Sequence, residues 1–289
     1  MTDLPSTPLY SHPGGAFTLL AGRAVSRLGF GAMRIVGKGV WGEPEFPVEV
    51  RRVLARVPEL GIDFIDTADS YGPFISEDLI HEVLHPYDGI TIATKGGFTR
   101  HGPGSWAEVG RPEYLRQCVL MSLRRLGVER LDLWQLHRID PAVPADEQFG
   151  VMKQMQDEWL IELLGLSEVS VEQVEVASRY FTVSTVQNRY NFSDRSSEDV
   201  LRYCEANGIG FIPWHPLSAG KLDVLPALDH IAREHGATPH QVVLAWLLAT
   251  SPAMLPIPGT GKVHHLEENM KAATLQLSKA EVKELDAAA

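Results

Sequence analysis

The chain has 289 residues, of which 44% are hydrophobic and 22% are charged, so it can bury a large core and disorder is not expected. Its formal net charge is −11, and it has no basic run that could follow the phosphates of a nucleic acid or an anionic lipid surface. We therefore expect neither nucleic acid nor a membrane among its partners.

The first 16 residues contain prolines and glycines but no apolar block of signal-peptide length, so we expect a loose leader there. Cys118 and Cys204 show no CxxC spacing, which is typical of reduced, buried cysteines in a cytosolic protein. We predict a cytoplasmic protein with one domain at residues 17–289.

Residues 14–27 carry two short apolar segments around Ala21 and Gly22, which predicts a hairpin. From residue 28 onward, short apolar runs alternate with longer segments of helical period, the pattern of βαβ units. Eight runs can be counted, at residues 28–32, 64–66, 90–95, 131–137, 163–167, 185–188, 210–214 and 253–257. Eight repeats without a break in composition favour an α/β fold, a (β/α)8 TIM barrel whose floor the N-terminal hairpin closes. An open, doubly wound sheet is the alternative.

Capping boxes mark the start of three helices, because a Ser or Thr is followed three residues later by Gln or Glu. The pairs are Ser170 with Gln173, Thr238 with Gln241, and Ser278 with Glu281. In a parallel barrel, chemistry is carried by residues at the carboxyl ends of the strands. The ends of the predicted strands are rich in reactive side chains: Asp66, Lys95, His137, Ser167, Gln187 and Trp214.

Residues 81–85 spell HExxH, which in zinc hydrolases places two imidazoles on one helical face beside a general base. Pro86 follows at once and disfavours helical geometry at His85, and no third ligand at a fitting distance is evident. A zinc hydrolase therefore stays a minor alternative, and we expect no metal.

Two glycine-rich segments resemble nucleotide-binding motifs without their context. Residues 37–42 spell GxGxxG, but Pro44 and Pro47 prevent the helix whose N-terminus should hold a pyrophosphate. We interpret this segment as a loop above the barrel, near the substrate. Residues 259–262 resemble a Walker loop only faintly, because Pro256 occupies the position of its first glycine.

The stretch at residues 61–72, Gly-Ile-Asp-Phe-Ile-Asp-Thr-Ala-Asp-Ser-Tyr-Gly, resembles the GxxxxDTAxxYG stretch of the aldo-keto reductases. Lys95 and His137 fall where that family has the rest of its catalytic tetrad, after Asp66 and Tyr71. The resemblance implies a reductase that takes hydride from a nicotinamide coenzyme and acts on a small-molecule carbonyl substrate.

The implied roles suit these residue types. Hydride delivery to a carbonyl carbon builds negative charge on oxygen, which a proton donor must neutralise, and the resemblance makes Tyr71 that donor. An adjacent ammonium lowers the pKa of a phenol, so Lys95 would assist Tyr71. Asp66 would hold Lys95 in place, and His137 would orient the carbonyl.

The resemblance also implies a coenzyme site. Gly165-Leu166-Ser167-Glu168 is similar to the family stretch that meets the nicotinamide carboxamide, and Gln187 should contact the same amide. A carboxylate accepts but cannot donate, so donation to the amide oxygen would fall to Ser167 or Gln187 rather than Glu168. Trp214 would stack on the nicotinamide ring. Further coenzyme contacts are expected at Gly31, Ala32, Met33, His215, Pro216, Leu217 and Gly220.

Residues 257–269 are similar to the family stretch IPGT…HLxEN, which grips the adenosine end of the coenzyme. The resemblance implies that Thr260, Lys262 and His265 meet a 2′-phosphate and that Glu268 and Asn269 meet the adenine. Gly259 is a further expected coenzyme contact. Lys262 is a point charge suited to phosphate, which favours NADPH over NADH. His265 replaces the usual arginine of the family.

Residues 27–34, followed by the loop at residues 37–44, look most like the pyridoxal reductase (pyridoxine 4-dehydrogenase) subgroup, so pyridoxal is a candidate substrate. A cofactor-binding regulatory barrel with little turnover is the alternative from another functional class. We expect a monomer or a weak homo-oligomer.

Overall fold

The computed structural model describes residues 11–217 and 226–288. Of the predicted leader, residues 1–10 lie outside this description. The residues that follow are bound to the barrel, since Leu28 donates a backbone hydrogen bond to Pro13 and Arg27 donates one to Gly15.

The central sheet is parallel and runs in the order β11-β10-β9-β8-β5-β4-β3. Seven of the eight predicted apolar runs overlap these strands, which confirms the βαβ pattern. The strands are β3 (Phe30–Gly31), β4 (Phe64–Asp66), β5 (Thr91–Gly96), β8 (Leu131–Leu136), β9 (Ile161–Ser167), β10 (Val183–Gln187) and β11 (Gly210–Phe211).

The eighth run, residues 253–257, closes the ring although it forms no regular strand. Phe211 donates to Ala253 and accepts from Leu255, each at 2.8 Å, and on the other side Gly29 donates to Pro256 at 3.0 Å. Pro256 has no N–H and cannot complete a ladder, which explains why no strand is formed there. The barrel predicted from the sequence is therefore present, with an irregular segment at the eighth strand position.

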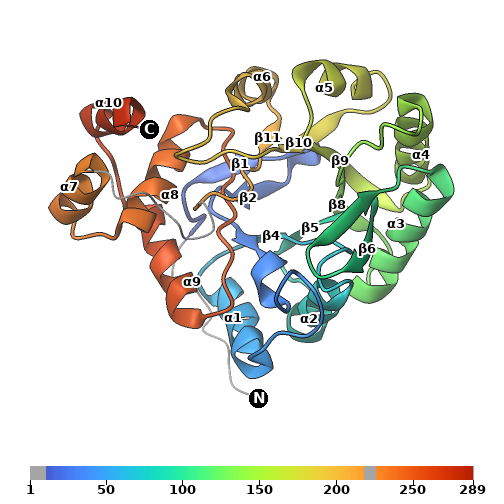
Figure 1. The fold of residues 1–289 in the computed structure, drawn as a ribbon, viewed down its shortest axis with the longest axis horizontal. Coiled ribbons are helices and arrows are strands. Elements are labelled where there is room, and N and C mark those ends of the chain that lie inside the picture. The colour runs from blue at the N-terminus through green and yellow to red at the C-terminus, as the bar shows by residue number, and fades with distance from the viewer. Residues whose placement is uncertain (1–10, 218–225, 289) are drawn as a thin grey trace.

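Helices surround the sheet as an outer ring (Figure 1). They are α1 (Pro47–Glu59), α2 (Ile75–Leu84), α3 (Pro112–Leu126), α4 (Ala145–Asp157), α5 (Val171–Ala177), α6 (Glu198–Asn207), α7 (Pro226–Glu234), α8 (Pro239–Thr250), α9 (Val263–Met270) and α10 (Lys279–Ala288). The predicted capping boxes open α5 and α8, and Ser278 and Glu281 exchange the same two bonds before α10.

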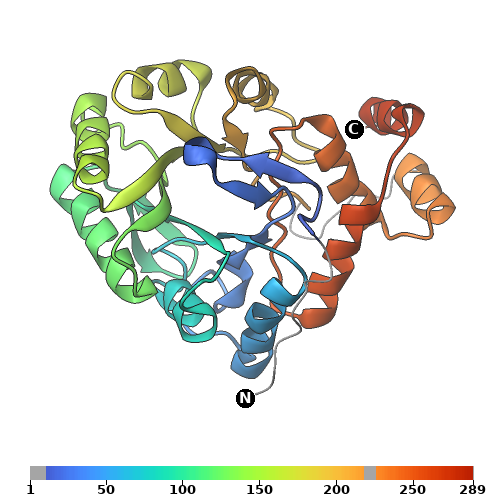
Figure 2. The same ribbon diagram turned by 180° about the vertical axis from the view of Figure 1, so that it is seen from behind.

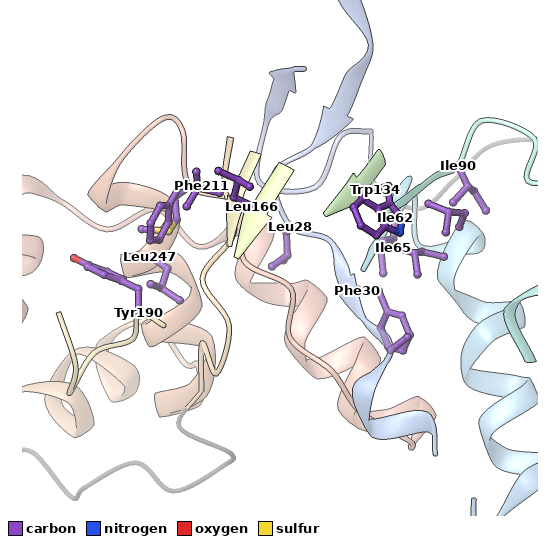
Figure 3. Close-up of a cluster of buried hydrophobic side chains, with 14 of the residues drawn as sticks. Leu28, Phe30, Ile62, Ile65, Ile90, Trp134, Leu166, Tyr190, Phe211 and Leu247 are labelled. Atoms are coloured by element: carbon purple, nitrogen blue, oxygen red, sulfur yellow. The ribbon is translucent and has the colours of Figure 1, made fainter. Parts of the chain in front are cut away.

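Alternate residues of each strand enter two apolar layers, as the two-residue period of a strand requires. Ile65, Ile92 and Trp134 pack outward with the helices, in the large cluster of which Figure 3 shows a part. Phe64, Ala93 and Leu133 point into the barrel and form a separate core there. The barrel interior is thus packed with side chains, not hollow.

The predicted N-terminal hairpin consists of β1 (Ala16–Thr18) and β2 (Ala24–Ser26), paired antiparallel. Leu19 and Val25 are buried in the inner core, which the hairpin caps from one end. Figure 2 shows the hairpin lying across that end of the barrel. The hairpin closes the barrel floor, as predicted.

A second hairpin, β6 (Phe98–Gly102) and β7 (Ser105–Glu108), follows β5 and was not predicted. Arg100 ties it to the glycine-rich loop, because its guanidinium donates to the carbonyls of Val40, Gly39 and Ser70. The loop at residues 37–42 is thereby held beside the segment that carries Tyr71, and Gly42 donates to Gly72. Within residues 11–217 and 226–288, no helix is long and apolar enough to cross a membrane.

Candidate active site

A layer of polar side chains lies directly above the inner apolar core. Asp66 and Lys95 each follow an inward-pointing residue, Phe64 or Ala93, by two positions, so they share its face of the sheet. Gln135 and Gln187 join the same layer from β8 and β10, and both are buried. The strand period therefore brings one carboxylate, one ammonium and two amides together inside the barrel.

Asp66 is the acceptor at the centre of this layer. Its Oδ1 accepts from Lys95 Nζ at 2.6 Å, and its Oδ2 accepts from Gln187 Nε2 at 2.8 Å and Gln135 Nε2 at 3.3 Å. Lys95 also donates to the carbonyl of Thr67 at 2.7 Å. Burial opposes the charge of Lys95, but Asp66 and Tyr71 outweigh it and raise the pKa of Lys95. Lys95 is thus a buried, paired ammonium.

Tyr71 lies in the loop after β4, with the Lys95 ammonium 5.3 Å from the centre of its ring. Burial raises the pKa of Tyr71, and the opposing charge of Lys95 does not cancel this effect. Lys95 therefore acts on the pKa of Tyr71 in the expected direction, but the depth at which the phenol is buried, which the sequence did not reveal, leaves that pKa raised. Tyr71 is held in its protonated form.

His137 follows β8 and faces Tyr71, with ring centres 6.0 Å apart. Its Nδ1 lies 3.3 Å from the hydroxyl of Ser70. Burial and then the charges of Lys95 and Arg138 place the pKa of His137 well below its usual value. The imidazole is neutral at physiological pH and offers one donor and one acceptor.

These residues lie at one end of a cavity of about 1530 Å³. Asp66, Tyr71 and His137 line it, whereas Lys95 is covered by them. Typical small-molecule sites measure roughly 300–1,000 Å³, so a dinucleotide and a substrate fit together in this one. Predicted coenzyme residues that also line it are Gly31, Met33, Ser167, Gln187, Trp214, His215, Pro216, Leu217, Gly259, Thr260, Lys262, His265, Glu268 and Asn269.

Two of the predicted coenzyme residues that the structure describes, Ala32 and Glu168, are not part of the lining. Ala32 is buried, and its carbonyl accepts from Ser76 at 3.4 Å. Glu168 is turned away: its Oε1 accepts from the indole N–H of Trp214 at 2.5 Å and from the backbone N–H of Arg189 at 2.7 Å. Gly220 lies outside the described residues.

The amide of Gln187 has a fixed orientation, because only its NH2 group can donate to the carboxylate of Asp66. The carbonyl oxygen of Gln187 is left as an acceptor beside the cavity, while its NH2 group uses one of two hydrogens on Asp66, so donation to a bound carboxamide by Ser167 or by Gln187 stays a prediction. The hydroxyl of Ser167 accepts from Arg138 at 2.9 Å and keeps its own hydrogen to donate. Ser167 and Gln187 together offer the donor and acceptor that a carboxamide requires.

Sequence reasoning missed several residues of the cavity wall, among them Phe98, Trp106 and Arg138. The first two belong to the unpredicted hairpin, where Trp106 meets Tyr71 edge-on at 6.4 Å between ring centres. Arg138 directly follows His137 in the sequence, and this position could have indicated that Arg138 also belongs to the site. Its guanidinium has no carboxylate within ion-pair distance in the described chain.

The HExxH segment lies elsewhere, on α2, which ends at Leu84. His81 contacts the carbonyl of Leu126 at 3.1 Å through Nδ1. Among residues 11–217 and 226–288, no group of three or more His, Cys, Asp or Glu side chains could hold a metal ion.

Comparison with known proteins agrees with this geometry. The family model for the "Aldo/keto reductase family" matches residues 27–289. The chain is 53% identical over 264 residues to "Uncharacterized oxidoreductase C215.11c" of Schizosaccharomyces pombe, which covers 91% of this chain and 86% of that protein. It is 38% identical over 274 residues to "Pyridoxine 4-dehydrogenase" of Escherichia coli, covering 92% of this chain and 96% of that protein.

Two solved structures share the fold. A thermostable aldo-keto reductase, Tm1743, in complex with the inhibitor epalrestat has a TM-score of 0.82 and 29% identity, covering 95% of this chain and 100% of that one. An aldo-keto reductase from Klebsiella pneumoniae in complex with NADPH has a TM-score of 0.79 and 23% identity, covering 94% of each chain.

Proposed function

Because the chain belongs to the aldo/keto reductase family, we propose that it reduces an aldehyde or ketone to an alcohol with NADPH, using Tyr71 as the proton donor. The observation that carries this proposal is the buried pair of Lys95 and Asp66 beneath Tyr71, at the end of a cavity large enough for coenzyme and substrate. Ser167 and Gln187 would hold the carboxamide of the coenzyme.

When bound, the coenzyme supplies a hydride to the carbonyl carbon. Tyr71 gives its hydroxyl proton to the carbonyl oxygen, which becomes the alcohol. The raised pKa of Tyr71 keeps this proton in place at neutral pH until negative charge develops on the oxygen. The phenolate that remains lies beside the ammonium of Lys95, so the charge is stabilised in a site with little water.

His137 orients the carbonyl in this proposal. A neutral imidazole can donate one hydrogen bond to the carbonyl oxygen without adding a second positive charge next to Lys95. The low pKa of His137 thus supports a role in binding and orientation, while the proton comes from Tyr71.

The cavity wall favours an aromatic or heteroaromatic aldehyde. Phe98 and Trp106 present aromatic faces beside His137, with Phe98 and His137 ring centres 4.5 Å apart. The guanidinium of Arg138, which has no carboxylate partner in the described chain, offers donors to an oxygen on such a ring. Pyridoxal, an aldehyde on a hydroxylated pyridine ring, meets both requirements, and the Escherichia coli relative is named for the corresponding dehydrogenase.

The variant Tyr71→Phe tests the proposal, since it removes only the hydroxyl. We expect turnover of pyridoxal and of other carbonyls to fall by about 10²-fold or more, while NADPH binding, followed by fluorescence quenching, changes less than about twofold. Tyr203→Phe, on α6 and outside the cavity, is the matched control and should keep full turnover. Turnover within a few-fold of the parent in Tyr71→Phe would contradict the assigned donor. A parent protein that binds NADPH but reduces no member of a carbonyl panel would favour the regulatory alternative.

A further inference from the structure

The part of the cavity wall formed by the N-terminal turns of α8 and α9 is rich in histidine. His264 and His265, in the first turn of α9, and His240, in the first turn of α8, all line the cavity, together with Lys262. The rings of His264 and His265 lie 4.1 Å apart between centres.

A carboxylate of the chain already binds the N-terminus of α9. Glu49, on α1, accepts a hydrogen bond from the backbone N–H of Val263 at 3.0 Å through Oε1, and Glu49 also lines the cavity. Val263 is the first residue of α9, where unpaired N–H groups and the helix dipole favour an anion. An incoming phosphate at this part of the wall must therefore tolerate the charge of Glu49.

We propose that this part of the cavity makes the choice between NADPH and NADH depend on pH, because His265 must gain a proton when a 2′-phosphate binds beside Glu49. This inference rests on the proposed coenzyme use. A 2′-hydroxyl needs no such proton and can donate to a carboxylate. The preference for the phosphorylated coenzyme rises as the pH falls toward the range in which imidazole titrates.

The charges around His265 explain why the proton is gained on binding. Burial, His264 and Lys262 lower the pKa of His265, with His240 adding to them and Glu268 opposing them. Other charged side chains of the same cavity wall are Glu49, Glu45, Lys38 and Arg34, of which Arg34 lies against Gly259 and Gly261. His265 is therefore neutral in the free protein at pH 7.5. A phosphate monoester with a second pKa near ~6 is a dianion there, and its charge reverses the balance in favour of imidazolium.

The test compares two fragments that differ only at the 2′ position, adenosine 2′,5′-bisphosphate and adenosine 5′-monophosphate. Calorimetric titrations at pH 7.5 in two buffers of different ionisation enthalpy measure the protons taken up on binding. We expect roughly half to one proton more for the bisphosphate, and an affinity ratio that rises several-fold between pH 8 and pH 6.5.

Two variants test which residue takes up the proton and which carboxylate opposes the phosphate. His265→Arg should abolish the extra proton uptake and bind the bisphosphate more tightly at pH 8, because arginine is always charged. Glu49→Gln keeps an acceptor for Val263 but removes the charge, so it should raise bisphosphate affinity several-fold without tightening the monophosphate. His230→Arg, on α7 and outside the cavity, is the control.

Equal proton uptake with both nucleotides, or uptake that persists in His265→Arg, would overturn the inference while leaving the proposed reductase intact. If neither nucleotide binds to the parent protein, the inference and the proposed function both fail.

Discussion

The pairing of Lys95 with Asp66 predicts a large effect of Asp66→Asn on stability. The side chain of Lys95 is fully buried and that of Asp66 is 2% exposed, so neither charge can turn to water. The substitution leaves the ammonium without its counter-charge, and the new amide cannot accept from Lys95, Gln187 and Gln135 together. Leaving one charge of a buried pair unmatched costs about 3–5 kcal/mol, which is the loss in free energy of unfolding that we expect.

The assay is urea unfolding of the coenzyme-free protein at pH 7, followed by tryptophan fluorescence. Lys95→Met should cost a similar amount, because it leaves the carboxylate of Asp66 buried with only amide donors. The double variant removes both charges, so it should be more stable than the sum of the two losses predicts, by at least ~2 kcal/mol. Additive losses, or single losses below ~1 kcal/mol, would refute a tightly coupled pair.

Two further predictions concern pH and substrate affinity. Burial, then Glu77, raises the pKa of Asp69 to about 7 from an ordinary 3.8. Between these two pKa values the folded protein holds a proton that the unfolded chain has lost. Asp69 therefore makes the free energy of unfolding fall as pH rises from about 4 to about 7, by roughly 4 kcal/mol in total. Urea unfolding of Asp69→Asn across this range should lack the decline. Trp106→Ala removes an aromatic wall worth about 0.5–1.5 kcal/mol, so steady-state kinetics with an aromatic aldehyde should show KM raised roughly two- to twelvefold with kcat little changed. An unchanged KM would exclude contact between Trp106 and the substrate.

The barrel could be predicted because its strands are short, buried on both faces and separated by helices of clear period. The hairpin of β6 and β7 could not be, since Arg100, His101 and two glycines interrupt any alternation of apolar and polar residues. Its pairing depends on contacts to other segments, above all the bonds from Arg100 to the loop at residues 37–42. These hydrogen bonds join residues about sixty positions apart in the sequence, so no local sequence pattern could predict them.

The positions of the catalytic candidates could be predicted from the sequence, but their pKa values and the directions of their hydrogen bonds could not. The motif spacing predicted these residues at the carboxyl ends of their strands. The structure has Asp66 and Lys95 at the ends of β4 and β5, His137 directly after β8, and Tyr71 in the loop after β4. The directions of the hydrogen bonds of Gln187 and Glu168 were not in the motif, because they depend on which partner lies opposite in space. The pKa of Tyr71 likewise depends on burial, which is determined by the whole fold.

The floor of the barrel and the chemistry above it are physically linked. Phe64, Ala93 and Leu133 form an apolar layer one strand period below Asp66, Lys95 and Gln135, and Leu19 of the N-terminal hairpin seals that layer from solvent. Interaction between charges weakens as the surrounding dielectric rises, so Lys95 acts strongly on Tyr71 only while water is excluded from beneath it. The hairpin thereby maintains the low-dielectric environment that our proposed roles for Lys95 and Tyr71 require.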